Sequence, residues 1–447
     1  MLFELQKPDL SNINRNDLYD ILIDLKRDDV REFVTKFSKS EYLYWDNIRY
    51  KEPSPQDISK EMLWSMIKLV RRQNSIPIAA IEDKKGRFFT WSRLDYFEEF
   101  FHNLDMNTGG ELFVEKGSVD RANKQKLITR GIMEEAIASS QLEGAATSRQ
   151  AAKKMLREGR APVNQSEQMI LNSYHSMKAI EEEYKDREMT MDLLLELHGL
   201  ITKDTLDSEG EKPRLRKAGE PICVTDKSTG AVYHEAPGID IVKKELQKLI
   251  KFANDDLNTG MFIHPIIKAI MLHFWMGYLH PFTDGNGRLA RMLFYWYLMK
   301  RGYWAFAYLP ISKVIKKSPI QYSMAYVYSE QDDNDMTYFI DYNIKKIKVA
   351  LQEFNEYLIE QSRGNVQMKS KCEKKYNLNM RQIQLLQYLH GDQNERTTLT
   401  AHMNVNQVTK VTASKDLKDL AKKGFLTFKK QGKYVYYYPT EKIKEIF

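Results

Sequence analysis

The sequence has very little cysteine: two residues in 447, Cys223 and Cys372, which lie far apart. Two distant cysteines exclude a disulfide framework, and they do not form the paired spacing of a zinc site. We therefore expect a protein of a reducing, cytoplasmic compartment.

Long apolar runs are missing as well. The most apolar stretch, residues 261–279, still contains two histidines, a proline and a lysine, and it predicts a buried helix instead of a membrane span. The beginning of the sequence lacks the basic flank and apolar core of a signal peptide. We expect no association with a membrane. The length of 447 residues predicts two or three domains.

Negative charge is scarce in one part of the sequence only. Residues 365–447 contain 16 Lys and Arg against 7 Asp and Glu, so this segment carries +9 and the rest carries −2 of the total +7. A basic segment of this kind favours an anionic partner such as nucleic acid. The alternative is a solvated, lysine-rich surface.

Residues 1–115 form the first of three predicted domains, and their pattern is mostly helical. A strand or hairpin is expected around residues 79–90, where Lys84-Lys85-Gly86 supplies a turn. No group of reactive side chains stands out in this part. We therefore expect residues 1–115 to serve in packing, or in contact with a substrate protein.

Residues 116–361 form the second predicted domain. Two short β-prone runs, 222–225 and 231–234, flank a turn and predict a single hairpin. Strands and helices do not alternate, which excludes a parallel sheet and predicts a mainly α fold. Helical patterns cover 121–148, 150–158, 165–188, 239–254, 261–278, 288–301, 312–325 and 335–361.

Residues 365–447 form the third predicted domain. The expected order is three helices followed by a β-hairpin with Gln431-Gly432 at its tip, which predicts an α+β winged helix. The helices are expected at 380–389, 398–403 and 412–423, and the strands at 425–428 and 434–438.

One stretch of twelve residues combines groups that folding alone does not require. Glycines before a helix leave backbone N–H groups open to an anion, and Arg288 and Arg291, one helical turn apart, suit a chain of phosphates. Asp284 suits Mg²⁺, and His280 suits a proton acceptor. A helix precedes the glycines, which excludes a dinucleotide fingerprint. The stretch reads His280-Pro281-Phe282-Thr283-Asp284-Gly285-Asn286-Gly287-Arg288-Leu289-Ala290-Arg291.

Each of these residues alone would be explained by structure, since a lone histidine and paired arginines are common at helix ends and surfaces. Together they indicate a site for a polyphosphate and an activated nucleophile. The residues do not by themselves distinguish transfer of AMP from transfer of phosphate.

In full, the stretch resembles the signature of the Fic (filamentation induced by cyclic AMP) family, and the resemblance extends over residues 120–350 or so. It implies a protein adenylyltransferase that moves AMP from ATP to a Ser, Thr or Tyr hydroxyl of a protein. His280 would deprotonate that hydroxyl and Asp284 would hold Mg²⁺. The family's ATP-binding groups correspond to Asp284, Gly285, Asn286, Gly287, Arg288 and Arg291.

The resemblance also assigns the other parts of the site. Phe282 would anchor the loop in the core. The predicted hairpin would be the family's flap, where Val224 and Thr225 would bind the target segment as an added strand. A homodimer and self-modification stay open.

A second motif, Ser139-Xaa-Xaa-Xaa-Glu143-Gly144, resembles the family's inhibitory helix, expected at about 132–144. Glu143 would pair with Arg291 and hold ATP unproductively. An ordinary helix end is the alternative. In some relatives the same glutamate supports removal of AMP, so de-AMPylation stays open.

The third predicted domain contains a run that resembles the recognition helix of DeoR-like regulators, with Lys415 in place of the usual arginine. It implies DNA binding through residues 380–440, although winged helices also bind proteins. A second interpretation of the whole sequence is therefore a transcriptional regulator whose Fic domain senses ATP. The run is Val411-Thr412-Ala413-Ser414-Lys415-Asp416-Leu417.

Overall fold

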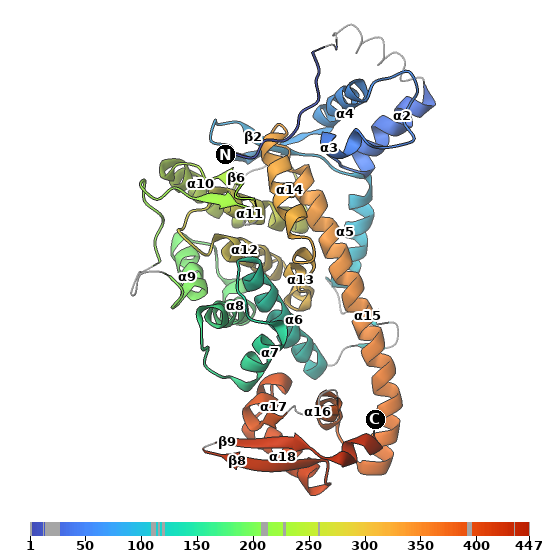
Figure 1. Cartoon of the computed structure of the whole chain (residues 1–447), viewed down its shortest axis with the longest axis vertical. Helices are drawn as coiled ribbons and strands as arrows, with labels where there is room; N and C mark the ends of the chain where they lie inside the picture. Colours follow the sequence, from blue (N-terminus) through green and yellow to red (C-terminus); the bar gives the residue numbers. More distant parts are fainter. Residues whose placement is uncertain are drawn as a thin grey trace.

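The structure is a computed structural model, and helices dominate it, as the sequence predicts (Figure 1). In the part of the chain that it describes, no helix is long and apolar enough to cross a membrane. The described residues are 2–11, 13, 27–108, 113–114, 117–118, 121–206, 213–226, 229–257, 260–390, 396–432 and 434–446.

Two buried helices form the centre, α11 (Pro265–Leu279) and α12 (Asn286–Lys300), which pack against each other. α11 begins later than expected because Pro265 occupies its first turn and the His264 side chain caps it, accepting a hydrogen bond from the Ile266 N–H. It ends at His280, whose φ of 42° is left-handed. The loop between the helices therefore makes a sharp turn at the centre of the core.

Other helices surround this pair and hold the loop. α6 and α9 pack against α12, and α8 bridges α6 and α9; α10 covers α11. The expected helix at 121–148 is shorter, because Gly144 adopts a φ of 105° just after α6. Their bounds are α6 (Arg121–Leu142), α7 (Arg149–Glu158), α8 (Gln165–Glu182), α9 (Met191–Thr202) and α10 (Ile239–Ala253).

The N-terminal part shares one hydrophobic core with these helices, which extends from Leu5 to Phe354. The expected hairpin is present, and Gly86 supplies its left-handed turn. The elements are α2 (Asp28–Thr35), a π-helix (Lys36–Ser40), α3 (Trp45–Ile48), α4 (Lys60–Asn74), β1 (Ile76–Glu82), β2 (Phe88–Trp91) and α5 (Asp95–Thr108). Two short strands follow, β3 (Phe113–Val114) and β4 (Gly117–Ser118). The proposed boundary at residue 115 stays a prediction.

The second predicted hairpin is also present, as β5 (Cys223–Thr225) and β6 (Val232–Glu235). An unexpected segment pairs with its outer strand. Leu2 bridges Val232 in parallel, and the Phe3 N–H donates to the Val232 carbonyl at 2.7 Å. The beginning of the chain therefore extends the flap sheet at β6.

Two predicted helix boundaries are wrong. The expected helix at 312–325 is split into α13 (Ile311–Ile315) and α14 (Pro319–Gln331), because Pro319 cannot continue a helix and starts a new one. α15 (Thr337–Tyr376) does not end at residue 361 but continues through Gly364. A short 3₁₀ segment, Trp304–Tyr308, precedes α13.

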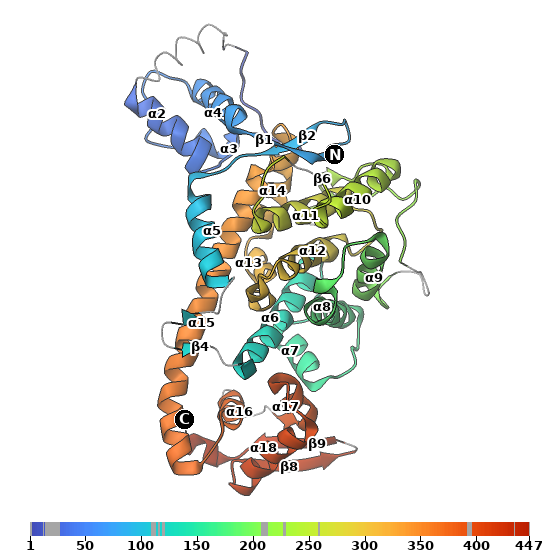
Figure 2. The same ribbon diagram turned by 180° about the vertical axis from the view of Figure 1, so that it is seen from behind.

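The C-terminal segment has a hydrophobic core of its own, from Leu378 to Ile446. Its order of elements is the predicted one, with β7 added, and the strands lie in the order β7-β9-β8. α17 packs on α7 and α6, which both views show (Figures 1 and 2). The winged-helix class stays a prediction. The elements are α16 (Met380–His390), β7 (Thr397–Thr398), α17 (Leu399–Asn406), α18 (Lys410–Lys422), β8 (Leu426–Gln431) and β9 (Tyr434–Pro439).

Candidate active site

The side-chain amide of Asn286 stabilises the turn of the loop between α11 and α12. The Asn286 side chain donates to the Phe282 carbonyl at 2.8 Å and accepts from the Phe282 N–H at 3.0 Å. Both polar atoms of this side chain are therefore used inside the loop. Its predicted phosphate contact stays a prediction, and the backbone N–H of Asn286 is the group better placed to make it.

Phe282 anchors the loop in the core, as expected, and its partner is a residue that the sequence did not indicate. The His198 ring on α9 stacks on Phe282 with centroids 3.7 Å apart and an interplanar angle of 9°. Nε2 of His198 lies 3.0 Å from the Asp284 carbonyl oxygen, which can only accept. A single side chain therefore holds both halves of the loop.

His280 is oriented by its own helix. Its Nδ1 hydrogen-bonds to the Gly277 carbonyl, so Nδ1 must carry the proton and Nε2 is left as the basic nitrogen. Burial and the nearby charge of His234 lower the pKa of His280 to about 4. The imidazole is therefore neutral, and able to accept a proton, at physiological pH.

Arg216 fixes the backbone around His280. Its Nε donates to the His280 carbonyl at 2.8 Å, and its backbone N–H donates to the Pro281 carbonyl at 2.9 Å. The guanidinium also bonds to the Pro237 carbonyl, which follows the flap. No pattern in the sequence indicates that Arg216 holds this loop.

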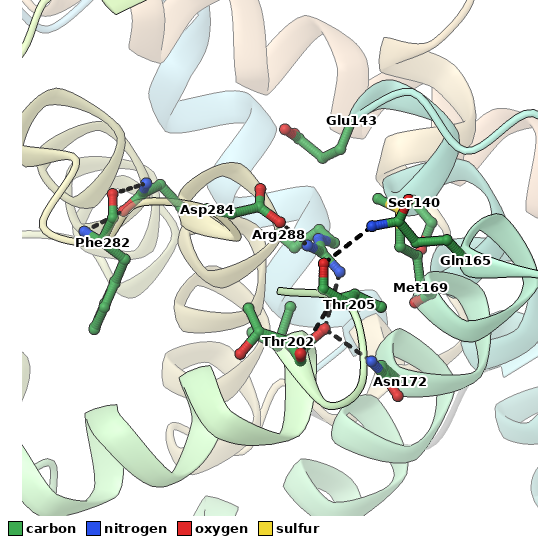
Figure 3. Close-up of polar contacts among 12 residues, drawn as sticks. Ser140, Glu143, Gln165, Met169, Asn172, Thr202, Thr205, Phe282, Asp284 and Arg288 are labelled. Carbon is green, nitrogen blue, oxygen red and sulfur yellow. Dashed lines mark hydrogen bonds and ion pairs between the residues drawn. The ribbon is translucent and has the colours of Figure 1, made fainter. Parts of the chain in front are cut away.

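Arg288 links the loop to α9. Its buried guanidinium donates to the Ile201 carbonyl at 2.9 Å and to Asp284 at 3.1 Å (Figure 3). The Asp284 side chain is 54% exposed, which leaves it open to a ligand. Burial lowers the pKa of Arg288, although an arginine stays charged. Two of its donors are thus occupied by protein, and its contact with an outer phosphate stays a prediction.

Arg291 makes the contact that the second motif predicts. It donates from Nε to the Ser139 hydroxyl at 2.8 Å, and from Nη2 to the Ser139 carbonyl at 3.0 Å and the Glu143 carboxylate at 2.8 Å. Burial raises the pKa of Glu143, but the charge and hydrogen bond of Arg291, together with the charges of Arg288 and His280, outweigh burial and lower the pKa. Glu143 is therefore ionised in this pair.

The Glu143 carboxylate also covers the beginning of α12. A Cβ atom placed on Gly287 would overlap this carboxylate, so the two groups are in close contact. The first turn of a helix presents free N–H groups and the positive end of its dipole. Glu143 thus lies where an anionic ligand would bind.

The predicted target-binding residues lie on β5. Val224 pairs with His234 of β6, and Thr225 is exposed. Because residues 2–3 cover β6, and no strand in the described part of the chain pairs with the other side of β5, an incoming segment would add along β5. This role of Val224 and Thr225 stays a prediction.

Part of this chain is similar to known proteins. Residues 188–298 match the family model described as Fic/DOC family. "Protein adenylyltransferase fic-1" of Caenorhabditis briggsae is 26% identical over 179 residues, which cover 40% of this chain and 31% of that protein. "Protein adenylyltransferase Fic" of Nematostella vectensis is 31% identical over 121 residues, 27% of this chain and 25% of that protein. The chain therefore spans less than a third of the length of these relatives.

Among solved structures, a Fic family protein from Desulfovibrio desulfuricans G20 is similar over 78% of this chain and 97% of that chain, at 17% identity and a TM-score of 0.49. The family match encloses the complete loop from His280 to Arg291, whereas Ser139 and Glu143 lie outside it. Residues 188–298 of this chain are therefore similar to the Fic/DOC family.

Proposed function

We propose that the protein is an adenylyltransferase that transfers AMP from ATP to a Ser, Thr or Tyr hydroxyl of another protein. The observation that carries this proposal is the orientation of His280. Its basic Nε2 lies in a loop that leads directly into the N-terminus of α12, so a proton acceptor adjoins an anion site. The names of the matched relatives support the same reaction.

In the proposed reaction, His280 removes the proton of the target hydroxyl. The hydroxyl oxygen forms a bond to the α-phosphorus of ATP, the bond from that phosphorus to the bridging oxygen breaks, and pyrophosphate leaves. Backbone N–H groups at the beginning of α12 offer fixed donors to the phosphates, and such preorganised donors stabilise developing charge. Arg291 joins them once it is released from Glu143.

The residues present fit a magnesium ion that arrives with the nucleotide. In the described part of the chain, no three His, Cys, Asp or Glu side chains lie close enough to form a metal site. Asp284 supplies one exposed carboxylate, and Mg²⁺ in nucleotide sites typically takes one or two carboxylates together with phosphate oxygens. Asp284 would hold the ion, which neutralises charge on the phosphates.

We further propose that Glu143 inhibits this activity. A carboxylate in contact with Gly287 and Arg291 repels phosphate from the N-terminus of α12 and occupies the guanidinium that would bind it. Removing the carboxylate frees both groups. AMP removal by the same residue would instead appear as loss of label when wild-type protein is added to a target that Glu143→Gly has labelled.

Two labels on ATP test the reaction. The Glu143→Gly protein is incubated with a cell lysate and Mg²⁺, once with ATP labelled at the α-phosphate and once at the γ-phosphate. We expect α-label on a protein that becomes labelled only when Glu143→Gly is added, and none on it with Glu143→Gly combined with His280→Ala. A γ-label that depends in the same way on the added protein and on His280 would show phosphate transfer instead. Peptide mapping of the labelled band then identifies the target.

A second activity is favoured by the surface of the C-terminal segment. Lys410, Lys415 and Lys418 are exposed along α18, and Lys429 and Lys430 are exposed on β8. We propose that this surface binds DNA, since lysines on a helix and an adjacent hairpin can contact phosphates. A gel shift with random duplex DNA should weaken steeply with salt and weaken with Lys415→Ala. No shift at low salt would reject it.

A further inference from the structure

One buried histidine outside the signature lies next to the catalytic loop. His234 is on flap strand β6, its side chain is 7% exposed, and its ring centroid is 5.9 Å from that of His280. Nδ1 is 2.7 Å from the Glu330 carboxylate, and Nε2 is 2.8 Å from the Tyr278 carbonyl. Both partners accept hydrogen bonds only, so both ring nitrogens carry protons and His234 is an imidazolium.

The charges around His234 agree with this protonation. Burial alone would lower the pKa of His234, but the Glu330 carboxylate and the hydrogen bond to the Tyr278 carbonyl together outweigh burial and raise the pKa. Lys84, on the turn between β1 and β2, opposes the charge more weakly. The cation is therefore held in place by α14 and by the C-terminal end of α11.

The same contacts fix the flap. Glu330 and Gln331 are consecutive residues at the end of α14; the first contacts β6, and the second contacts the N-terminal segment that pairs with β6. Glu330 binds His234, while Gln331 accepts from the Leu5 N–H at 2.9 Å and donates to the Phe3 carbonyl at 2.7 Å. The N-terminal segment that covers β6 is thus clamped by the neighbour of the residue that pairs with His234.

We propose that His234 is a positioning residue for His280: locked between Glu330 and the Tyr278 carbonyl, it fixes β6 on the end of α11 and adds to the burial that disfavours protonation of the neighbouring His280 ring. A second cation 5.9 Å away is unfavourable in a buried site, so the charge on His234 disfavours protonation of His280. The proposal rests on the proposed function only where it concerns catalysis.

Other charges also face His280, and they determine the expected size of the effect. Arg216 acts in the same direction as His234, and Glu143 acts against both. Burial is the largest influence and stays when His234 is replaced. We therefore expect a partial rise of the His280 titration midpoint, by about one pH unit, when the His234 charge is removed.

Histidine NMR tests this without any need for activity. The nine histidines are labelled at Cε1, and the His280 signal is assigned by its loss in His280→Ala. His234→Gln, which keeps one N–H donor but no charge, should raise the His280 midpoint. Glu330→Gln removes the carboxylate that stabilises the charge on His234, so it should also raise the His280 midpoint. This variant provides the test if His234→Gln does not fold. His102→Gln, which removes an exposed histidine on α5, is the matched control and should change nothing.

The catalytic part is measured in the Glu143→Gly background. In this background, His234→Gln should shift the acidic limb of the kcat/KM pH profile to higher pH by the same amount as the His280 midpoint. KM for ATP should stay unchanged. An unchanged His280 midpoint in both variants would overturn the proposal, even if kcat fell equally at every pH. If the midpoint moves but no variant transfers AMP, the positioning role stands and the proposed function fails.

Discussion

The Glu143 carboxylate accepts a hydrogen bond of 2.8 Å from the Arg291 guanidinium, across 148 positions of the sequence. The Arg291 side chain is 3% exposed and the Glu143 side chain is 33% exposed. The arginine is therefore a fixed part of the core, whereas the glutamate can be reached by solvent and can leave. Of the two partners, Glu143 is therefore the one that we propose a phosphate replaces.

The contact between Glu143 and Gly287 predicts a non-additive pair of substitutions. Gly287→Ala should destabilise the wild-type protein by about 1–3 kcal/mol, because the added methyl group overlaps the Glu143 carboxylate. In the Glu143→Gly background the same substitution should cost close to nothing, since alanine favours a helix over glycine. Urea unfolding of the four proteins measures the coupling. If Gly287→Ala lowered the free energy of unfolding equally in both backgrounds, the Glu143 carboxylate would not be in contact with Gly287.

The low pKa of His280 predicts a broad pH range for transfer. Because burial and His234 lower the pKa of His280 to about 4, the base form persists at pH 5–7. In Glu143→Gly, which loses a charge that raises this pKa, kcat/KM should therefore show no acidic limb from His280 above about pH 5. A limb near 6.5, the value of an ordinary histidine, would contradict the environment described for His280.

The same shift has a consequence for stability. The folded-state pKa of His280 lies below its unfolded value, so protonation favours the unfolded chain, and stability falls as the pH drops from about 6.5 toward 4. His280→Gln removes this contribution. Its free energy of unfolding should therefore depend less on pH in that window than that of the wild-type protein.

A buried carboxylate predicts where the C-terminal segment is most sensitive. Asp416 on α18 accepts from Asn379 and Arg381 and lies 3.2 Å from Nε2 of His402. Asp416→Ala should destabilise this segment by about 3 kcal/mol, because it leaves Arg381 and His402 without their acceptor. Lys415→Ala, an exposed neighbour on the same helix, should cost less than about 0.5 kcal/mol. Hydrogen exchange of residues 380–446 in urea would measure both losses of stability. A similar small loss in the two variants would show that the contacts of Asp416 do not stabilise this segment.

The sequence predicted the parts of the site that are local. The loop from His280 to Arg291 is a single continuous pattern, and its glycines and helix starts are visible without a structure. The pairing of Arg291 with Glu143 was predictable only because a second motif marks the glutamate. The two hairpins were likewise indicated by turn residues between β-prone runs.

The parts that the sequence did not predict depend on contacts between distant segments. His198 and His234 lie against the loop from two separate elements, and Glu330 acts on it only through His234. A lone histidine on a helix or strand has no distinguishing periodicity. The Asn286 side chain illustrates a second limit, because an amide suits a phosphate as well as its own backbone. Helix α15 continues through Gly364 although a helical glycine costs about 1 kcal/mol, which shows that context overrides local propensity.

The most direct test of the account compares the rates at which purified wild-type, Glu143→Gly and Glu143→Gly/His280→Ala proteins transfer α-labelled AMP to the protein target mapped from the lysate. Transfer by Glu143→Gly should be at least about tenfold faster than by wild type, the factor that corresponds to about 1.4 kcal/mol. The double variant should transfer nothing. Equal rates for wild type and Glu143→Gly would contradict inhibition by Glu143, and undiminished transfer without His280 would contradict its role as the base.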